Sequence, residues 1–312
     1  MAEMKKVATR DSYGAALAEL GAEHKDLVVL DADLAGATKT AVFKKAFPDR
    51  HFDFGIAEAN MVSAAAGMAT AGLVPFASSF AMFAAGRAFE QVRNSIGYPH
   101  LNVKIGATHG GISVGEDGAS HQCCEDFALM RSIPGMTVIC PADDVEAKAA
   151  VKAAYEMNGP VYLRFGRLAV PVFHSEDYKF QIGKGEILKD GTDVAIIANG
   201  LLTYEAIQAG EILAEAGINA MVINMATIKP LDEELVLEAA KKCGKVITCE
   251  EHSVIGGLGE AVCSLLSEKL PTPVRRIGVN DEFGHSGPAV ALLKQFGLSA
   301  EHIVEVAKEF CK

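Results

Sequence analysis

The residues best suited to chemistry lie in a glycine-rich segment, Gly106 to Glu125, and at a carboxylate that precedes it, Glu58. The segment holds two histidines, His109 and His121, with the run Gly115-Glu116-Asp117-Gly118 between them. Imidazoles and carboxylates exchange protons with substrates, and they cost free energy when they are buried without partners. This loop is therefore poorly suited to a core and well suited to surround a polar substrate.

The elements that must position these residues are strands alternating with helices. The predicted strands are 27–30, 51–54, 73–76, 101–105, 136–140 and 160–165. Helices are predicted at 58–71 and 143–157, and another contains Tyr13, Leu17 and Leu20 behind a capping candidate, Asp11 or Ser12. Strands joined by helices of this length imply right-handed crossovers and a largely parallel sheet. Glu58 then stands where a strand leads into a helix.

A change of pattern near residue 170 divides the chain. Residues 171–184 show no clean period, and alternation then resumes with strands at 194–197, 220–224, 246–249 and 274–277. Helices are predicted at 203–216, 232–242, 257–269 and 288–295; the glycines at 256–259 lack phosphate-loop spacing and indicate a helix start. We predict an α/β chain of two domains, each a mostly parallel sheet covered by helices. The domains are residues 1–170 and 185–312, with a linker at 171–184.

Composition narrows the class of partner and the compartment. The 29 basic and 40 acidic residues give a formal net charge of −11, which argues against nucleic acid and anionic membranes as partners. Seven cysteines without paired metal spacing indicate reduced thiols. We see no signal peptide and no apolar run of the ~20 residues that a membrane span needs. A cytoplasmic protein is expected.

Several short motifs follow one another along the chain. They are Ala8-Thr9-Arg10, Asp31-Ala32-Asp33-Leu34, Gly55-Ile56-Ala57-Glu58, the Phe80/Phe83 segment, Thr108-His109-Gly110-Gly111, residues 115–122 and Arg164-Phe165-Gly166-Arg167. In their order and spacing they resemble the C-terminal half of transketolase, a thiamine diphosphate enzyme, or equivalently the second chain of a split transketolase. The resemblance covers nearly the whole chain.

The resemblance assigns the cofactor-binding residues. Glu58 would hydrogen-bond the pyrimidine ring nitrogen of thiamine diphosphate, so that the amino group of the cofactor becomes the base that removes its thiazolium proton. A dry site would keep this acid protonated or sharing a proton. Phe80 would stack on the pyrimidine with Phe83 beside it, and Ile56 would make an apolar contact to the cofactor.

The resemblance also assigns the substrate-binding residues. His109 and His121 would hydrogen-bond oxygens of the donor ketose and assist proton transfer, and Asp117 would accept from the hydroxyl next to the cleaved bond. Arg10 and Arg167, with His109, would hold the terminal phosphate of a sugar phosphate, because a guanidinium donates two hydrogen bonds in one plane.

One position departs from the family pattern. Transketolases often carry a phosphate-contacting serine four residues after the position of Asp33, and this chain has Ala37 followed by Thr38. Either Thr38 takes over this contact or one hydrogen bond to the phosphate is absent. The acceptor sugar is therefore open.

A second departure concerns the diphosphate. The Gly-Asp-Gly…Asn segment that holds the diphosphate and Mg²⁺ (or Ca²⁺) in full-length members has no counterpart here, so we assign no metal ligand to this chain. The resemblance implies an N-terminal-half partner chain, a heterotetramer with two copies of each chain, and activity only in that assembly. Alone, the chain is expected to form an inactive homodimer. The pathway implied is the pentose phosphate pathway.

Two other interpretations stay open. One is a related thiamine enzyme, either a 1-deoxyxylulose-5-phosphate synthase-like chain or the beta subunit of a 2-oxo acid dehydrogenase. His109 favours transketolase over the synthase, and the paired histidines and arginines favour it over the dehydrogenase. The last interpretation is a non-catalytic binding homologue. The joint presence of Glu58, Phe80, His109, Asp117, His121 and Arg167 speaks against it.

Overall fold

The computed structural model describes residues 4–312, and its first part is built on a seven-stranded sheet. Its strands are β2 (Leu27–Asp31), β3 (His51–Asp53), β4 (Val74–Phe80), β5 (Lys104–Thr108), β6 (Thr137–Ile139), β7 (Val161–Arg164) and β12 (Thr227–Lys229). They lie in the order β12-β6-β7-β5-β4-β2-β3, and every pair is parallel except β12 with β6. The carboxyl ends of the parallel strands therefore meet along one edge, where α/β proteins bind ligands.

Helices cover both faces of this sheet. The longer ones are α1 (Thr9–Glu23), α3 (Ala41–Ala46), α4 (Glu58–Thr70), α6 (Asp126–Arg131) and α7 (Asp144–Glu156). Short segments connect them: α2 (Ala35–Thr38), α5 (Phe89–Gln91), the 3₁₀ turns η1 (Pro48–Arg50) and η4 (Ile112–Asp117), and the π-helical η2 (Met82–Arg87) and η3 (Val92–Gly97). One hydrophobic cluster includes Met61 and Ala65 of α4, and the other joins Leu17 of α1 to Val151 of α7. The small residues of α4 allow close packing on the sheet.

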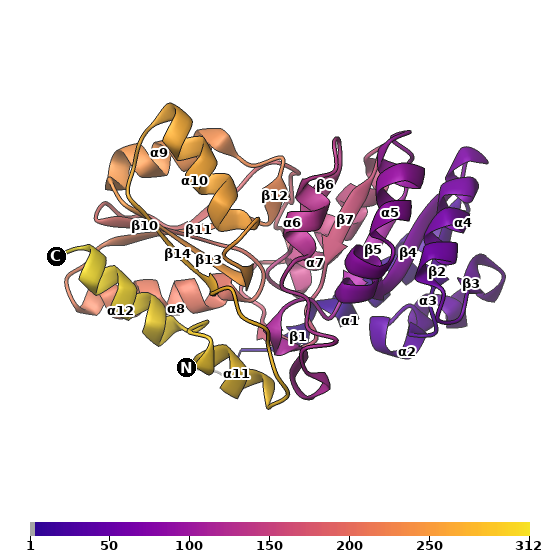
Figure 1. Cartoon of the computed structure of the whole chain (residues 1–312), viewed down its shortest axis with the longest axis horizontal. Helices are drawn as coiled ribbons and strands as arrows, with labels where there is room; N and C mark the ends of the chain where they lie inside the picture. The colour runs from indigo at the N-terminus through magenta and orange to yellow at the C-terminus, as the bar shows by residue number, and fades with distance from the viewer. Residues whose placement is uncertain (1–3) are drawn as a thin grey trace.

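The second domain repeats this architecture with five strands. They are β9 (Glu186–Lys189), β10 (Val194–Ala198), β11 (Ala220–Asn224), β13 (Val246–Ser253) and β14 (Val274–Val279), in the order β14-β13-β10-β11-β9. Only β9 is antiparallel to its neighbour. Its helices are α8 (Leu202–Glu215), α9 (Glu233–Cys243), α10 (Leu258–Lys269), α11 (Ala289–Gln295) and α12 (Ala300–Phe310). Figure 1 shows α8 and α12 on one face and α9 and α10 on the other, which confirms the predicted fold class.

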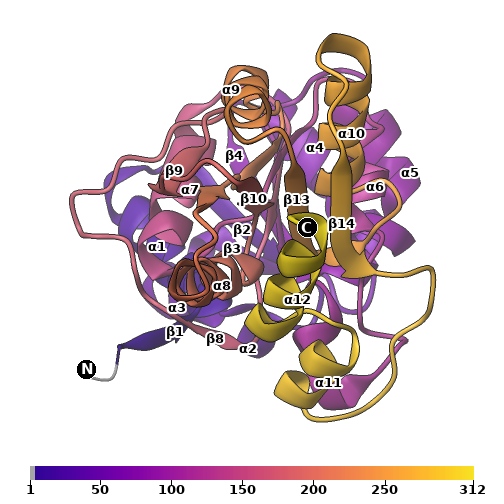
Figure 2. The same cartoon turned by 90° about the vertical axis from the view of Figure 1, so that its left-hand side faces the viewer.

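Two strand pairings join parts of the chain that are far apart in sequence. Strand β1 (Lys6–Ala8) runs antiparallel to β8 (Ala169–Pro171), so the start of the chain lies beside the end of the first domain (Figure 2). Strand β12 follows β11 in the chain but extends the first sheet beside β6. We keep the division at residues 171–184 as a proposal, with β12 as a strand that the second domain adds to the first sheet.

The structure corrects one predicted boundary and refines others. Neither Asp11 nor Ser12 caps α1, because the helix begins at Thr9 directly after β1, and Ala8 is its N-cap. The Thr9 hydroxyl instead accepts a hydrogen bond from the Gly166 amide at 2.8 Å. Strand β4 reaches Phe80, beyond its predicted end at 76. Helix α12, which no prediction covered, completes the second domain.

The remaining sequence expectations concern membrane spans, thiols and the glycines at 256–259. Among residues 4–312, no helix combines the length and the apolar character that a membrane crossing requires. All seven cysteines are free. The glycine run leads into α10 as predicted, and the buried Glu250 carboxylate accepts from the amides of Leu258 and Gly259 at 2.7 and 2.8 Å. A side-chain carboxylate thus accepts hydrogen bonds from the backbone amides at the start of this helix.

A buried histidine in the predicted linker contacts acidic side chains of both domains. His174 Nδ1 lies 3.0 Å from Asp143 at the start of α7, and Nε2 lies 3.0 Å from Glu186 in β9. Burial lowers the pKa of His174, but the Asp143 hydrogen bond and the charges of Glu146, Asp143 and Glu186 outweigh it, so the pKa is raised. The folded protein therefore favours the imidazolium form.

This arrangement predicts pH-dependent stability. Because the folded pKa of His174 is raised, its contribution is complete below the unfolded pKa of ~6.5 and is lost as pH rises through the folded value. Compared with His174→Gln, the wild type should gain about 2 kcal/mol of unfolding free energy at low pH, the scale of hydrogen bonds to charged groups. Urea unfolding of both proteins from pH 5.5 to 9 measures this difference. A difference that stays constant or grows with pH would contradict the assignment.

Candidate functional site

Most of the predicted site residues converge at the carboxyl edge of the first sheet. Phe80 ends β4, His109 follows β5, and Arg167 follows β7 by a short turn. Arg10 lies in the first turn of α1, and Glu58 is the first residue of α4, which follows β3. The strand order places β4, β5 and β7 side by side, so residues far apart in sequence meet at one edge.

The Glu58 carboxylate is nearly inaccessible, with 2% of its side chain exposed. Both of its oxygens accept hydrogen bonds from Nη1 of Arg87, at 2.9 and 3.0 Å. The Arg87 guanidinium also lies over the ring of Phe83, 4.4 Å from the centroid. Glu58 thus pairs with Arg87 in this structure, because a buried carboxylate is costly without a positive partner.

Sequence reasoning missed Arg87. It lies 29 residues after Glu58, in the last position of η2, and no local pattern distinguishes it from a solvated arginine. The one available signal was indirect, since an acid expected to be buried requires a partner. Only the packing of η2 against α4 identifies which residue supplies it.

Aromatic rings gather beside this ion pair. The rings of Phe80 and Phe83 are stacked with centroids 5.9 Å apart, and His109 stacks on Phe80 at 3.7 Å. His121 presents its ring edge-on to Phe83 at 5.4 Å. Ile56, in contrast, is 76% exposed and lies outside this cluster's buried core. The two phenylalanines and two histidines thus form one wall, which can bind a flat ring by stacking.

His109 is buried and electrically neutral. Nη1 of Arg10 donates to its Nε2 at 2.9 Å, because an arginine can only donate. The ring proton therefore sits on Nδ1, which donates to the Thr108 hydroxyl at 2.8 Å. Burial and the positive charges of Arg10 and Arg167 lower the pKa of His109 to about 3. Nε2 is thus an acceptor near neutral pH, and in this structure it accepts from Arg10.

Positive charge concentrates around His109. Burial lowers the pKa of Arg10, the nearby Asp11 opposes this, and the charge of Arg167 adds to the lowering. Arg167 Nη1 donates to the Val114 carbonyl at 2.5 Å and to Glu116 at 2.9 Å. Two guanidinium groups near each other and a neutral histidine are suited to an anion that accepts hydrogen bonds.

The polar residues of the glycine-rich loop differ in their exposure to solvent. His121 is half-buried, with Nδ1 3.0 Å from the Ser120 hydroxyl, whereas Asp117 is exposed at the end of η4. Thr38 does not face the site: its buried hydroxyl donates to Asp31 at 2.7 Å. The Ala37 carbonyl instead accepts from Arg10 at 3.3 Å. Thr38 therefore does not replace the serine that the family pattern carries at position 37.

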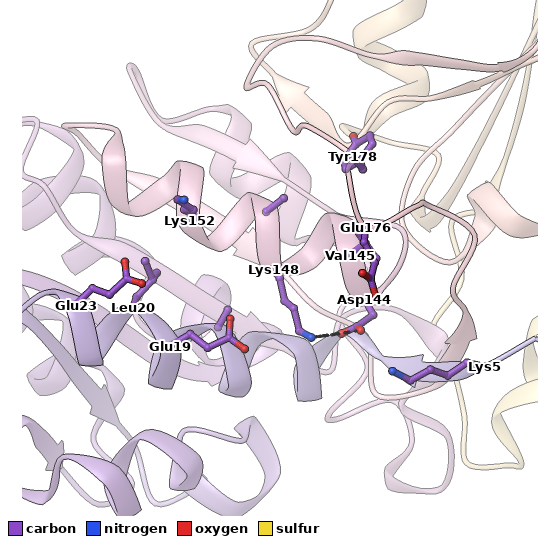
Figure 3. A pocket seen from close by; sticks show the side chains of 12 residues that line it. Lys5, Glu19, Leu20, Glu23, Asp144, Val145, Lys148, Lys152, Glu176 and Tyr178 are labelled. Atoms are coloured by element: carbon purple, nitrogen blue, oxygen red, sulfur yellow. Dashed lines mark hydrogen bonds and ion pairs between the residues drawn. The ribbon is translucent and has the colours of Figure 1, made fainter.

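A separate surface groove lies between α1 and α7 (Figure 3). Its volume is about 490 Å³, and its lining mixes lysines with acids, such as Lys5, Lys148, Glu19 and Asp144. Lys148 already pairs with Asp144 at 3.4 Å. Charges that neutralise one another offer no net field to a ligand, and none of the predicted site residues lines this groove. The predicted site residues lie at the sheet edge instead.

The residues at the sheet edge fit one end of thiamine diphosphate. A buried carboxylate beside the half-buried ring of Phe83 suits a flat heterocycle that hydrogen-bonds through a ring nitrogen. The diphosphate and its cation need several oxygen ligands. Within residues 4–312, no three His, Cys, Asp or Glu side chains converge in a way that could hold a metal ion. The described residues at this edge therefore suit the ring of the cofactor.

Comparison with known proteins identifies a family for both parts of the chain. Residues 5–172 match the family described as transketolase, pyrimidine binding domain, and residues 183–303 match transketolase, C-terminal domain. The chain is 53% identical to a putative transketolase C-terminal section from Methanocaldococcus jannaschii, over 97% of this chain and 96% of that protein. It is 44% identical to a 6-deoxy-6-sulfo-D-fructose transketolase subunit from a Clostridium species, over 96% of this chain and 93% of that protein.

A solved structure gives the same result in three dimensions. It is described as a split gene transketolase, an inactive beta4 tetramer, and it superimposes with a TM-score of 0.91 at 54% identity, covering 97% of this chain and 98% of that one. A third relative, one subunit of the apulose-4-phosphate transketolase of Phocaeicola vulgatus, is 41% identical over 98% of each chain. The protein therefore belongs to the transketolase family, as the C-terminal section of a split enzyme.

Proposed function

We propose that this chain is the C-terminal subunit of a thiamine diphosphate-dependent transketolase that moves a two-carbon ketol unit between sugar phosphates. The observation that carries the proposal is the grouping, at one sheet edge, of a buried carboxylate, a stacked aromatic wall and a cationic pocket. The carboxylate and the aromatic wall suit a flat ring, the histidines of that wall suit the oxygens of a sugar, and the cationic pocket suits a terminal anion. A cytoplasmic enzyme of the pentose phosphate pathway is the setting we propose.

Each part of the site has a task in this reaction. When bound, thiamine diphosphate supplies the carbanion that cleaves the carbon–carbon bond next to a ketose carbonyl. Glu58 would hydrogen-bond the pyrimidine nitrogen once Arg87 moves from its carboxylate, and Phe80 would stack on the ring with Phe83 beside it. His109 would accept from a sugar hydroxyl through Nε2 once Arg10 turns from that nitrogen toward the terminal phosphate, and His121 would exchange protons with the sugar oxygens.

The anion-binding part of the site indicates the substrate class. Arg10 and Arg167 would hold the terminal phosphate, and Asp117 would accept from the hydroxyl next to the cleaved bond. With Ala37 in place of serine and Thr38 bonded internally, we propose that this chain makes one fewer contact to the phosphate. The names of two relatives refer to sugars with a sulfonate and with a 4-phosphate, so ketoses that end in an anion are the class we propose.

The remainder of the active site requires a second polypeptide. We propose an N-terminal-half chain that binds the diphosphate with Mg²⁺ or Ca²⁺, in a heterotetramer of two chains of each kind. Without this partner, we propose that the chain self-associates as a dimer. A solved structure described as an inactive beta4 tetramer supports self-association without activity, although with four copies rather than two.

A reconstitution assay tests the function. The chain is mixed with its N-terminal-half partner, thiamine diphosphate and Mg²⁺, and xylulose 5-phosphate and ribose 5-phosphate are supplied. We expect sedoheptulose 7-phosphate as the product. A parallel mixture with a sulfonated ketose as donor separates a phosphate-specific enzyme from one that accepts other anions. Absence of ketol transfer from every anionic ketose in the complete mixture would refute the proposal.

Arg167 provides a test of the anion pocket. Replacing it by alanine should raise the KM for the phosphorylated donor by about tenfold or more, because one charge-assisted hydrogen bond is worth about 1.5–3 kcal/mol. Turnover should change less, since Arg167 binds an end of the substrate that does not react. Steady-state kinetics of the assembled enzyme measure both. Arg275→Ala, an exposed arginine on β14, is the matched control, and an unchanged KM in Arg167→Ala would count against the phosphate role.

A further inference from the structure

The loop that carries the proposed sugar-binding residues relies on the second domain for its shape. We define the substrate loop as residues 109–122. Three of its glycines, Gly111, Gly115 and Gly118, have positive φ angles. Gly118 lies against Ser286, and Gln122 donates to the His285 carbonyl at 3.1 Å. One side of the loop therefore rests on the second domain.

The most buried of these contacts comes from Glu251. This residue lies on β13, is 4% exposed, and accepts a hydrogen bond from the Ser113 amide at 2.6 Å. The two residues are 138 positions apart. Ser113 lies in the first turn of η4, where a buried amide otherwise has no partner within the turn and costs free energy. Glu251 thus satisfies the donor at the start of the segment that leads to Asp117.

The Glu251 carboxyl group also packs closely against the backbone of the substrate loop. A side chain added at Gly111 would collide with the Glu251 carboxyl group, so the loop backbone touches that group directly. The Glu251 carbonyl accepts from Arg164 at 2.7 Å, and a side chain added at Gly110 would collide with the same arginine. Burial raises the pKa of Glu251, and the charge of Arg164 opposes that rise. Glu251 and Arg164 thus pack directly against the backbone of residues 110–113.

We propose that Glu251 is a positioning residue, through which the second domain holds the substrate loop in the shape that binds the sugar. This inference rests on the proposed function, because it assumes that His109, Asp117 and His121 contact the sugar. Glu251 itself touches neither the substrate nor the cofactor in this account. It acts by fixing the backbone between His109 and Asp117. The second domain then takes part in substrate recognition rather than only in the architecture of the subunit.

The neighbouring acid on the same strand provides a matched control. Glu250 is similarly buried, at 1% exposure. Its carboxylate, however, accepts hydrogen bonds from backbone amides at the start of α10 and not from the substrate loop. Glu250→Gln and Glu251→Gln therefore remove the same charge from adjacent positions of β13. A general loss of stability would appear in both variants, whereas a loss of loop geometry would appear only in Glu251→Gln.

The first measurement uses the chain by itself and does not depend on activity. Amide hydrogen exchange, followed by mass spectrometry over residues 109–122, reports the stability of the loop. In Glu251→Gln this peptide should exchange about tenfold faster, because the neutral amide oxygen of glutamine accepts a weaker hydrogen bond from Ser113 than the carboxylate does. In Glu250→Gln the same peptide should match the wild type. Unchanged exchange in Glu251→Gln would overturn the proposal.

The second measurement uses the assembled enzyme with its partner chain. In Glu251→Gln the KM for the donor sugar phosphate should rise about tenfold, while the Kd for thiamine diphosphate, measured by calorimetry, should stay within about twofold of the wild type. Glu250→Gln should leave both constants unchanged. If the wild type turns over and Glu251→Gln retains its KM, the positioning role is wrong. If the wild type transfers no ketol unit at all, the proposed function fails, and the exchange experiment still decides whether Glu251 holds the loop.

Discussion

Replacing Glu58 by glutamine should lower turnover of the assembled enzyme by at least about 100-fold, the range in which positioned acid–base groups act. Glutamine keeps the size of the side chain but cannot carry the proton or the charge that the carboxyl group exchanges with the pyrimidine nitrogen. The Glu58 side chain is 2% exposed and starts α4, so water has little access to take over its role. Single-turnover kinetics with a saturating donor measure the effect on chemistry alone.

Two controls make the Glu58 result specific. Glu238→Gln changes an exposed acid on α9, and it should have wild-type activity. Thermal unfolding of Glu58→Gln should stay close to that of the wild type, because its partner Arg87 is about half exposed and can be solvated by water. Turnover within about twofold of the wild type would show that Glu58 does not serve the cofactor.

Omitting the partner chain should have the largest effect of all. With thiamine diphosphate, Mg²⁺ and both sugar phosphates present, this chain alone should form product at least about 1,000-fold more slowly than the complete mixture, a loss of about 4 kcal/mol of transition-state stabilisation. The physical reason is the proposed division of the active site, in which the partner chain binds the diphosphate and its cation. A diphosphate with its cation requires several oxygen ligands in a defined arrangement.

The omission experiment needs a titration rather than a single point. Activity should rise with added partner chain and reach a plateau at one partner per chain. Thiamine diphosphate affinity, followed by calorimetry, should rise in parallel, because we propose that both polypeptides contribute to the cofactor site. The partner chain assayed without this one is the second control. Product formed by this chain alone at a substantial rate would refute the division of the active site between two chains.

The elements of the fold were largely predictable from local patterns. Apolar runs predicted β2, β3, β10 and β11 within one or two residues, and the small-residue segment predicted α4. The start of α1 was mispredicted, because Thr9 uses its hydroxyl on Gly166, a partner 157 residues away. Helix α12 carried its own signal in Ile303, Val304 and Ala307, which repeat at helical spacing behind Ser299.

The candidate site was predictable as a set of residues but not as a geometry. The motifs, through their resemblance to transketolases, named Glu58, Phe80, His109 and Arg167. They did not show that Arg10 donates to His109, 99 residues away, and thereby sets which ring nitrogen carries the proton. They also left Thr38 as a candidate for the phosphate, although its hydroxyl is buried against Asp31.

The sequence by itself determined the alternation of strands and helices, the class of the fold and the identity of most residues proposed for the site. Periodicity and short motifs act over a few residues, so they are legible along the chain. Only the tertiary structure decided that Arg87 neutralises Glu58 and that Glu251 supports the loop at Ser113. These partners depend on strand order and on the contact between domains, because a buried charge pairs with whichever group the packing brings near it.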